Sequence, residues 1–232
     1  MGRLVDSIRA RQRAGVFPVL AEVKVRSAKS GELLGDRDPA EYARQVAAAP
    51  VAGVSVVIEP EHFGGSLHLL RTVRTAVEVP ILAKDFISSR EQIEAAAAAG
   101  ADAVLLISSM LDHDRLVALI ADCRDIGVES LVEGHNDREL AAITSLGSDL
   151  VGINNRDITI LEVDDTDVTR TAELARLHTG GQPLISESSI TSPADVARAR
   201  DAGADAVLVS TAVLQAADPT AFVHSLTEVG WP

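Results

Sequence analysis

Two charged residues inside a valine-rich apolar segment offer the first chemistry in this sequence. Glu22 and Lys24 lie two residues apart in V-L-A-E-V-K-V, a pattern that predicts a β-strand over residues 19–25. Both side chains would then leave the strand on the same face. A carboxylate and an ammonium buried together are costly unless they are paired or used in catalysis. This segment alone is compatible with either a salt-bridged strand end or an active site.

Strand-like and helix-like segments alternate along the rest of the chain. We expect strands at residues 19–25, 53–58, 81–84, 103–107, 128–132, 150–154, 183–186 and 206–209. We expect helices at about residues 38–49, 66–75, 89–100, 112–126, 137–146, 165–177 and 192–202, and another from 218. Several of these helices begin with recognisable caps, as at Asp38-Pro39 and Ser192-Pro193. Eight β-α units indicate a (β/α)8 TIM barrel rather than an open sheet.

An internal repeat supports the barrel. The sequence G-A-D-A-V-L occurs at residues 100–105 and again at 203–208. A repeat at this half-chain offset is expected of a barrel built from two four-stranded halves. We therefore predict one α/β domain over residues 1–232. Residues 1–18 form a short N-terminal helical extension, and residues 19–232 form the barrel.

Charged and polar residues gather where the predicted strands end. These positions are Glu22, Lys24, Glu59, Lys84, Asp85, Ser108, Glu133, Asn154, Glu187, Ser188, Ser210 and Thr211. The strand interiors are apolar, so the charge is concentrated at one end of the barrel. Parallel α/β barrels keep their active sites at the carboxyl ends of the strands. The pattern therefore predicts an active site at this end.

Lysine usage points to proton transfer at the same place. The chain has 18 arginines but only three lysines, and Lys24 and Lys84 both stand at strand ends. Since arginine serves wherever a positive charge suffices, these lysines indicate a need for an ammonium that can donate a proton. The alternative is that they are ion-paired structural residues. Glu133 is the candidate general base, whereas His135, just beyond the strand, is expected to be a loop residue.

A phosphate site is predicted near the last two strands. Ser188-Ser189 and Ser210-Thr211 each follow a strand and precede a helix, where backbone N–H groups can hold an anion. The glycines that usually allow the backbone to approach a phosphate closely are absent from both segments. The sequence thus predicts a phosphate site of reduced strength.

Composition excludes several classes of function. A net charge of −13 argues against a nucleic-acid or anionic-membrane surface, so an anionic substrate needs a locally basic pocket. No apolar segment reaches membrane-spanning length, and the N-terminus does not resemble a signal peptide, so we expect a cytoplasmic protein. The single cysteine, Cys123, is expected to be a packing residue. The histidines lack metal-ligand spacing, so no metal is expected.

Five ordered motifs between residues 19 and 219 resemble a known family. They are A-E-V-K-V-R-S, P-I-L-A-K-D-F, L-V-E-G-H, G-I-N-N-R-D and S-E-S-S-I. In this order they resemble indole-3-glycerol phosphate synthase of tryptophan biosynthesis. The resemblance implies a TIM barrel that closes, decarboxylates and dehydrates 1-(o-carboxyphenylamino)-1-deoxyribulose 5-phosphate. It also implies a lyase that needs no cofactor or metal, has a phosphorylated small molecule as its partner, and is a monomer or weak homo-oligomer.

The resemblance implies catalytic roles for five residues. Lys84 would be the general acid that protonates the ribulose carbonyl during ring closure, and Glu133 the acid/base residue of dehydration. Lys24 would hold the substrate carboxylate and assist proton transfer, with Glu22 positioning it. Asn154 would hydrogen-bond the reacting hydroxyl.

The resemblance also implies a set of binding residues. Arg156 would face the anionic substrate, Glu187 would orient the lysines, and Ser188 would contact the phosphate. The other residues expected to bind substrate are Ser27, Glu59, Phe63, Phe86, Leu106, Ile158 and Leu161, with Ser189, Ser210 and Thr211 at the phosphate.

Departures from the family pattern keep alternatives open. Ser189 and Ser210 stand where the family usually has glycine, Gly134 replaces a branched residue, and the N-terminal segment is short. These changes suggest a diverged paralogue. A related phosphate-barrel isomerase or aldolase is one alternative, the aldolase using Lys84 as a Schiff base. A barrel that binds a ligand without turnover is the other.

Overall fold

Eight parallel strands close into a barrel in the computed structural model, which describes residues 2–161 and 167–232. The strands are β1 (Val19–Val23), β4 (Gly53–Val57), β5 (Ile81–Lys84), β6 (Ala103–Ile107), β7 (Glu129–Gly134), β8 (Leu150–Asn154), β9 (Leu184–Glu187) and β10 (Ala206–Val209). They pair in sequence order, and β1 closes the ring by pairing with both β4 and β10. The predicted fold class is confirmed.

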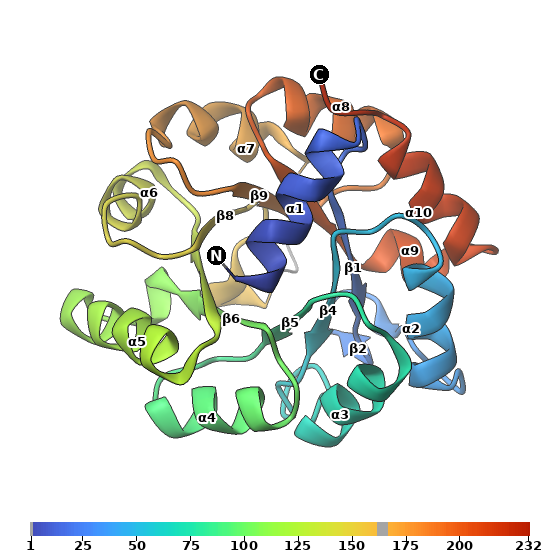
Figure 1. Cartoon of the computed structure of the whole chain (residues 1–232), viewed down its shortest axis with the longest axis horizontal. Coiled ribbons are helices and arrows are strands. Elements are labelled where there is room, and N and C mark those ends of the chain that lie inside the picture. The colour runs from blue at the N-terminus through green and yellow to red at the C-terminus, as the bar shows by residue number, and fades with distance from the viewer. Residues whose placement is uncertain (1, 162–166) are drawn as a thin grey trace.

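Helices surround the barrel, as Figure 1 shows. They are α2 (Pro39–Ala47), α3 (Leu67–Ala76), α4 (Arg90–Ala98), α5 (His113–Ile126), α6 (Asp137–Ile143), α7 (Thr169–Leu174), α8 (Pro193–Asp201), α9 (Thr211–Gln215) and α10 (Pro219–Thr227). Short 3-10 helices follow β6 (η1, Ser108–Met110), β8 (η2, Ile158–Ile160) and α7 (η3, Ala175–Leu177). In the described residues, no helix is both long and apolar enough to cross a membrane.

The caps predicted from the sequence begin the helices as expected. Asp38 and Ser192 each accept a hydrogen bond from the first turn of their helix, which has proline in its first turn. Two details differ from prediction, and one cannot be compared. The strand expected at residues 128–132 runs to Gly134 and so includes Glu133, and the additional helix α9 begins directly after Ser210. The start expected for the helix near residue 165 lies outside the described residues.

The apolar residues form two layers. The larger lies between the strands and the outer helices, while the smaller fills the barrel interior with residues such as Leu20, Leu82, Leu131 and Leu208. The apolar side chains of the strands are therefore buried on both faces of the sheet, as parallel barrels require.

The N-terminal helix α1 (Arg3–Arg13) covers the amino-terminal end of the barrel. Its Leu4 and Ile8, one turn apart, are fully buried and join the interior core. The carboxylate of Glu129, at the start of β7, accepts hydrogen bonds from Leu4 N at 2.6 Å and Val5 N at 3.0 Å. These bonds satisfy two N–H groups at the start of the helix.

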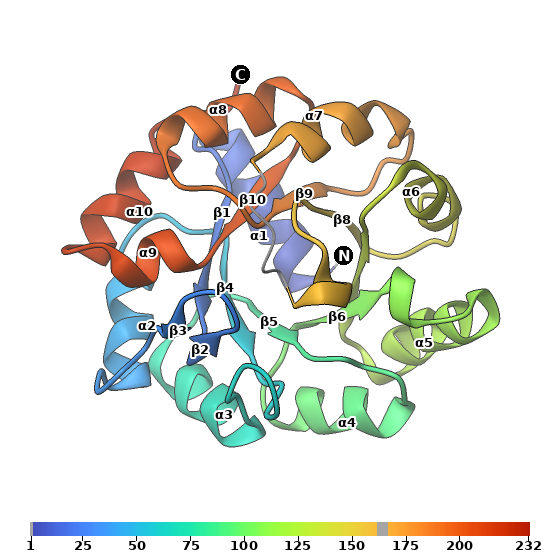
Figure 2. The same cartoon turned by 180° about the vertical axis from the view of Figure 1, so that it is seen from behind.

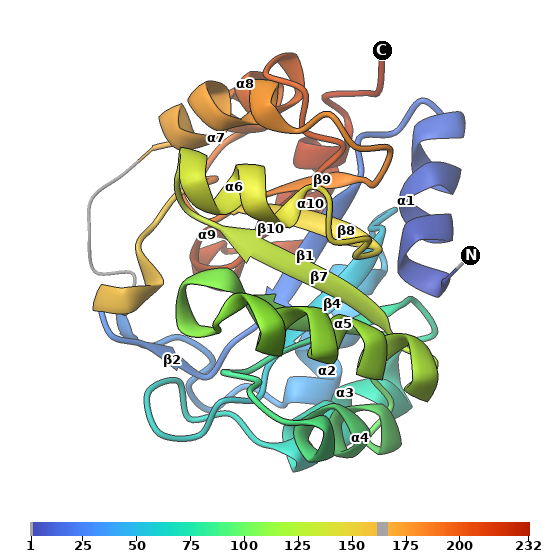
Figure 3. The same ribbon diagram turned by 90° about the vertical axis from the view of Figure 1, so that its left-hand side faces the viewer.

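The opposite end of the barrel is built from loops. Seen from behind in Figure 2, the short hairpin β2 (Arg26–Ser27) and β3 (Gly31–Glu32) lies on this side together with η2. Figure 3 shows α1 and β2 at opposite ends of the barrel. This second end is the carboxyl end of the strands, where the sequence concentrates its charges.

Candidate active site

Lys84 lies between two carboxylates at the carboxyl end of the barrel. Its Nζ is 2.9 Å from Oε2 of Glu187 on β9 and 3.8 Å from Oε2 of Glu22 on β1. Ser55 Oγ also donates to Glu22 Oε2, at 3.2 Å. Two flanking anions favour the ammonium form of the lysine. The side chain is 12% exposed, so this ammonium can still reach a substrate.

Glu187 is held at the deepest point of this cluster and is fully buried. Burial raises the pKa of Glu187 above its usual range, whereas Lys84 pulls it back down. Its Oε1 lies against Gly152 of β8, where a Cβ would stand only 2.3 Å from that oxygen. Glycine at residue 152 therefore makes room for the carboxylate that orients Lys84.

Glu133 forms a second acid/base group across the barrel. Its Oε2 accepts a hydrogen bond from Asn154 Nδ2 at 3.1 Å, and its Oε1 lies 3.2 Å from Nε2 of His135. The Glu133 side chain is 1% exposed, yet the residue lines the cavity described below. It is thus placed to exchange a proton with a bound molecule.

An aromatic ring packs against the ammonium of Lys24. Lys24 follows β1, and its Nζ lies 4.5 Å from the centroid of the Phe63 ring. The rings of Phe63 and Phe86 meet edge to face with centroids 6.2 Å apart. An aromatic ring with a carboxylate substituent would find an apolar wall and a cation side by side here.

Two adjoining cavities meet at these charged residues. The first is lined by Val57, Glu59, Phe63, Asp85, Phe86, Leu105, Ile107, Glu133, Asn154 and Ile158, and the second by Arg156, Ser188, Ser189, Ile190, Thr191, Leu208, Ser210, Thr211, Ala212 and Gln215. Glu22, Lys24 and Lys84 line both. We call the first the aromatic lobe and the second the serine lobe. The three shared residues place two lysines and one carboxylate at the junction of the lobes.

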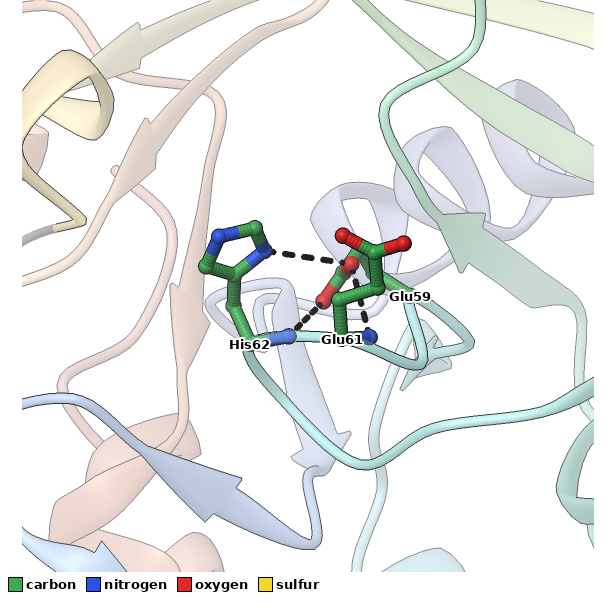
Figure 4. A group of neighbouring side chains, drawn as sticks. All are labelled: Glu59, Glu61 and His62. Carbon is green, nitrogen blue, oxygen red and sulfur yellow. Dashed lines mark hydrogen bonds and ion pairs between the residues drawn. The ribbon is translucent and has the colours of Figure 1, made fainter.

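Glu59 anchors the loop that carries Phe63. Its carboxylate accepts backbone N–H bonds from Glu61, His62 and Phe63 at 2.8–3.0 Å. Figure 4 shows its oxygens joined to the backbone nitrogens of Glu61 and His62 and to the His62 ring. Burial raises the pKa of Glu59, but these hydrogen bonds outweigh burial and lower it. Ligand-capable atoms of Glu59, Glu61 and His62 lie within 4.8 Å of one another. Since backbone N–H groups already occupy the Glu59 carboxylate, we assign the group to loop anchoring.

The serine lobe contains a left-handed turn. Ser188 and Ser189 have φ angles of 63° and 59°, a conformation that glycine adopts readily and serine does not. Asn155 holds this turn, because its Nδ2 donates to the carbonyl oxygens of Glu187 at 2.9 Å and Ser188 at 3.2 Å. Helix α8 begins at Pro193, as the sequence predicts, so Ser188 lies in the loop before this helix rather than at its N-terminus.

The other side of the serine lobe offers unpartnered polar atoms. Helix α9 begins directly after Ser210, as expected for an N–H group facing an anion. Arg156 Nε and Ser210 Oγ are buried and have no hydrogen-bond partner among the described residues. A buried guanidinium and a buried hydroxyl without such partners favour the binding of an anionic ligand.

Comparison with known proteins agrees with this geometry. The family model described as indole-3-glycerol phosphate synthase matches residues 2–226. The chain belongs to this family. A synthase of this name from Nocardioides sp. is 45% identical over 217 residues, which are 94% of this chain and 82% of that protein. One from Thermococcus kodakarensis is 41% identical over 221 residues, 95% of this chain and 96% of that protein.

A third relative has the same name with a number added. Indole-3-glycerol phosphate synthase 2 of Streptomyces coelicolor is 39% identical over 208 residues, 90% of this chain and 80% of that protein. The family assignment makes the chain a carboxy-lyase with a TIM barrel, as the resemblance implied.

Most side chains expected at the synthase site line one of the two lobes, but four do not. Glu187 is fully buried and contacts Lys84 instead of lining a lobe. Leu106 is fully buried in the outer core layer, and its neighbours Leu105 and Ile107 face the aromatic lobe instead. Ser27 Oγ accepts the Ser30 N–H within the β2–β3 hairpin. Leu161 packs against the interior core beside the lobe without lining it. Placing Leu106 in the pocket was an error of strand register.

Three other residues near the site were given no role from the sequence. His135 lies in the loop between β7 and α6, as expected, but its side chain is only 8% exposed and lies 3.2 Å from Glu133. Glu139 lies three residues after Asn136, and this N-x-x-E spacing is the signal of a capping box that could have revealed its place. Asn155 gives no such signal, because its partners lie on β9.

Proposed function

We propose that Lys84 and Glu133 perform the proton transfers of the indole-3-glycerol phosphate synthase reaction in this chain. The observation that carries this proposal is the position of Lys84 at the junction of an aromatic lobe and an anion-binding lobe. The substrate 1-(o-carboxyphenylamino)-1-deoxyribulose 5-phosphate has an aromatic acid at one end and a phosphate at the other. Its ketone lies between them and would face Lys84.

The aromatic lobe binds the carboxyphenyl ring. Phe63 and Phe86 pack on the ring, and Ile107 and Ile158 close the sides. Lys24 holds the ring carboxylate, which keeps this group close to its cation until it leaves as CO2. The serine lobe binds the phosphate through Arg156, Ser210 and the backbone of the Ser188–Ser189 turn.

Ring closure uses Lys84 as the acid. The ring carbon that bears the carboxylate attacks the ketone carbon, and the ketone oxygen takes a proton from the Lys84 ammonium to become a hydroxyl. Glu22 and Glu187 keep that ammonium charged and aimed before the transfer. The carboxylate then leaves as CO2, and the electrons of the broken bond restore the aromatic ring.

Dehydration uses Glu133. The new hydroxyl leaves as water after it gains a proton, and a second proton leaves the five-membered ring to complete the indole. Glu133 lies in the lobe with Asn154 on one carboxylate oxygen, so a substrate hydroxyl can approach both side chains. The ion pairs of Lys84 also argue against the aldolase alternative, since a Schiff base requires a neutral amine.

The experiment that tests this proposal mixes the protein with the carboxyphenylamino-deoxyribulose phosphate and follows indole fluorescence. We expect product in the absence of added metal or organic cofactor, and no lysine adduct after borohydride treatment. Absence of indole product, or covalent trapping of substrate on Lys84, would overturn the proposal. The expected cytoplasmic location and the expected monomer or weak homo-oligomer stay predictions, the latter open to measurement of native mass.

A further inference from the structure

His135 lies between two glutamates, one of which is the proposed acid/base residue. Its Nε2 is 3.2 Å from Oε1 of Glu133 on β7, and its Nδ1 is 3.2 Å from Oε2 of Glu139 on α6. His135 lines neither lobe of the cavity, whereas Glu133 lines the aromatic lobe. The imidazole therefore supports Glu133 from outside the cavity.

Both ring nitrogens face carboxylate oxygens, and this decides the charge of the ring. A neutral imidazole carries one N–H and one lone pair, so either tautomer would turn a lone pair toward a carboxylate. Only the imidazolium presents an N–H to each of the two carboxylates. The contact with Glu133 lies outside hydrogen-bond geometry and is an ion pair, so the two neighbouring negative charges favour a positive charge in a side chain that is 8% exposed.

Glu139 is fixed in place by several donors. As the third residue of α6, it completes the helix cap with Asn136: Glu139 N donates to Asn136 Oδ1 at 3.0 Å, and Asn136 Nδ2 donates to Glu139 Oε1 at 2.6 Å. Glu139 Oε2 also accepts the backbone N–H of His135 at 2.8 Å. A carboxylate held this firmly fixes the plane of the imidazole.

Gly134 allows α6 to come this close to the barrel. A Cβ on Gly134 would lie 3.2 Å from Ile143 Cδ1 and 3.4 Å from Glu139 Cβ, which is tighter than ordinary packing. A branched side chain at residue 134 would add further atoms in that direction. Glycine therefore brings Glu139 within reach of His135.

The charges around the imidazole favour its protonated form. Burial lowers the pKa of His135, but Glu133 and Glu139 outweigh burial and raise it to about 9. Asp157, just before η2, adds a further negative charge that His135 and Arg170 stabilise. Glu133, Glu139 and Asp157 are thus the acidic groups that surround the ring.

We propose that His135, oriented by Glu139, is a positioning residue that faces the Glu133 carboxylate with a positive charge during the acid/base step. The inference rests on the role proposed above for Glu133. Asn154 hydrogen-bonds one oxygen of that carboxylate, and the imidazolium forms an ion pair with the other at 3.2 Å. The imidazolium also forms an ion pair with Glu139, so Glu133 can still accept a proton. When it does, the net charge of the Glu133, His135 and Glu139 cluster changes from −1 to 0.

The first test compares pH profiles of kcat/KM for His135→Gln and Glu139→Gln. Loss of the imidazolium should move the acidic limb of the profile up by about one pH unit, because a nearby opposite charge shifts an acid by about 1–3 units. Glu139→Gln keeps the helix cap and should not move this limb upward. The Km of His135→Gln should change little, since the ring does not line the cavity.

His224→Gln is the matched control, because His224 forms an exposed pair with Glu228 at 3.3 Å on α10, away from the site. Its profile should match that of the wild type. Phosphate ionisation in the substrate affects every variant equally and cancels in the comparison. An unshifted acidic limb in His135→Gln, with only a lower unfolding midpoint, would reduce His135 to a packing residue and overturn the proposal.

The second test needs no turnover. In an NMR titration of the histidine rings, assigned through His135→Gln, His135 should stay protonated beyond pH 8 in the wild type. It should lose its proton at lower pH in Glu139→Gln. Titration of wild-type His135 near its ordinary value of about 6.5 would contradict the proposal.

Glu133→Gln separates this inference from the proposed function. If Glu133→Gln retains wild-type turnover, the role of Glu133 itself is wrong. If Glu133→Gln is inactive while His135→Gln has an unshifted profile, only the role of His135 is wrong.

Discussion

Strand β7 carries a buried glutamate at each end, and the two serve different purposes. Glu129 and Glu133 are four residues apart, face the barrel interior and are 5% and 1% exposed. Glu129 accepts two backbone N–H bonds from α1, whereas Glu133 contacts the side chains of Asn154 and His135 beside a cavity. The hydrogen bonds from backbone N–H groups give Glu129 a structural role, whereas Glu133 faces the aromatic lobe. Residue type and depth alone do not distinguish the two; their partners do.

The largest expected effect lies at the carboxyl end of the barrel. Lys84→Ala should lower kcat by about 10²–10⁴-fold while KM changes much less, because a proton donor acts mainly in the transition state. Steady-state kinetics measures this, with Lys29→Ala in the exposed hairpin as the control. More than a tenth of wild-type kcat in Lys84→Ala would show that the acid lies elsewhere.

A substitution at the amino-terminal end of the barrel should change the stability of the protein rather than its catalytic rate. Glu129→Ala leaves the N–H groups of Leu4 and Val5 without their acceptor and should reduce the free energy of unfolding by about 1–3 kcal/mol. Urea denaturation measures the loss, and Asp114→Ala in the exposed first turn of α5 is the control. The kcat of folded Glu129→Ala should equal that of the wild type. A large decrease in kcat would show that the amino-terminal end of the barrel also contributes to catalysis.

A smaller effect is expected in the serine lobe. Ser189→Gly should stabilise the fold by about 1 kcal/mol, because a left-handed non-glycine residue costs about 1–2 kcal/mol. Ser210→Gly is the matched control, since Ser210 has a φ of −115° and should gain nothing from the change. Denaturation of both variants measures this.

Phosphate titration of the double variant then tests the hydroxyls. We expect Ser189→Gly combined with Ser210→Gly to bind inorganic phosphate slightly more tightly than the wild type, because the backbone can approach more closely. A clear loss of affinity would instead identify the serine hydroxyls as phosphate ligands.

The stability of the Glu133 end should also depend on pH. The pKa of His135 is raised from 6.5 to about 9, so its ion pairs stabilise the fold fully below about pH 6.5 and are lost as the pH rises through 9. The difference in unfolding free energy between wild type and His135→Gln should therefore shrink over that range. A difference that grows toward pH 9 would show that the ring is buried uncharged.

The strands and the location of the site could be predicted because their signals are local. Alternation, caps and the repeated G-A-D-A-V-L segment mark each β-α unit, and the charges at strand ends mark the functional rim. Leu106 was misplaced because A-V-L-L-I is apolar throughout, so it carries no alternation that shows which face points inward.

Contacts that arise only when the barrel closes could not be predicted from local patterns. Lys84 and Glu187 are 103 residues apart in the sequence, and their pairing was expected only from the family resemblance, because it depends on the relative register of β5 and β9. The place of His135 depends on how closely α6 approaches at Gly134. Neither contact can be predicted from the spacing of residues that are near in the sequence.

The most direct test of the account measures single-turnover indole formation by Glu133→Gln and Glu129→Gln side by side. Both changes are isosteric, lie on one strand and remove one buried carboxylate. We expect Glu133→Gln to be slower than wild type by about 10²–10⁴-fold and Glu129→Gln to match the wild-type rate. Equal rates in the two variants would contradict the claim that their partners, rather than their depth, set the role of each glutamate.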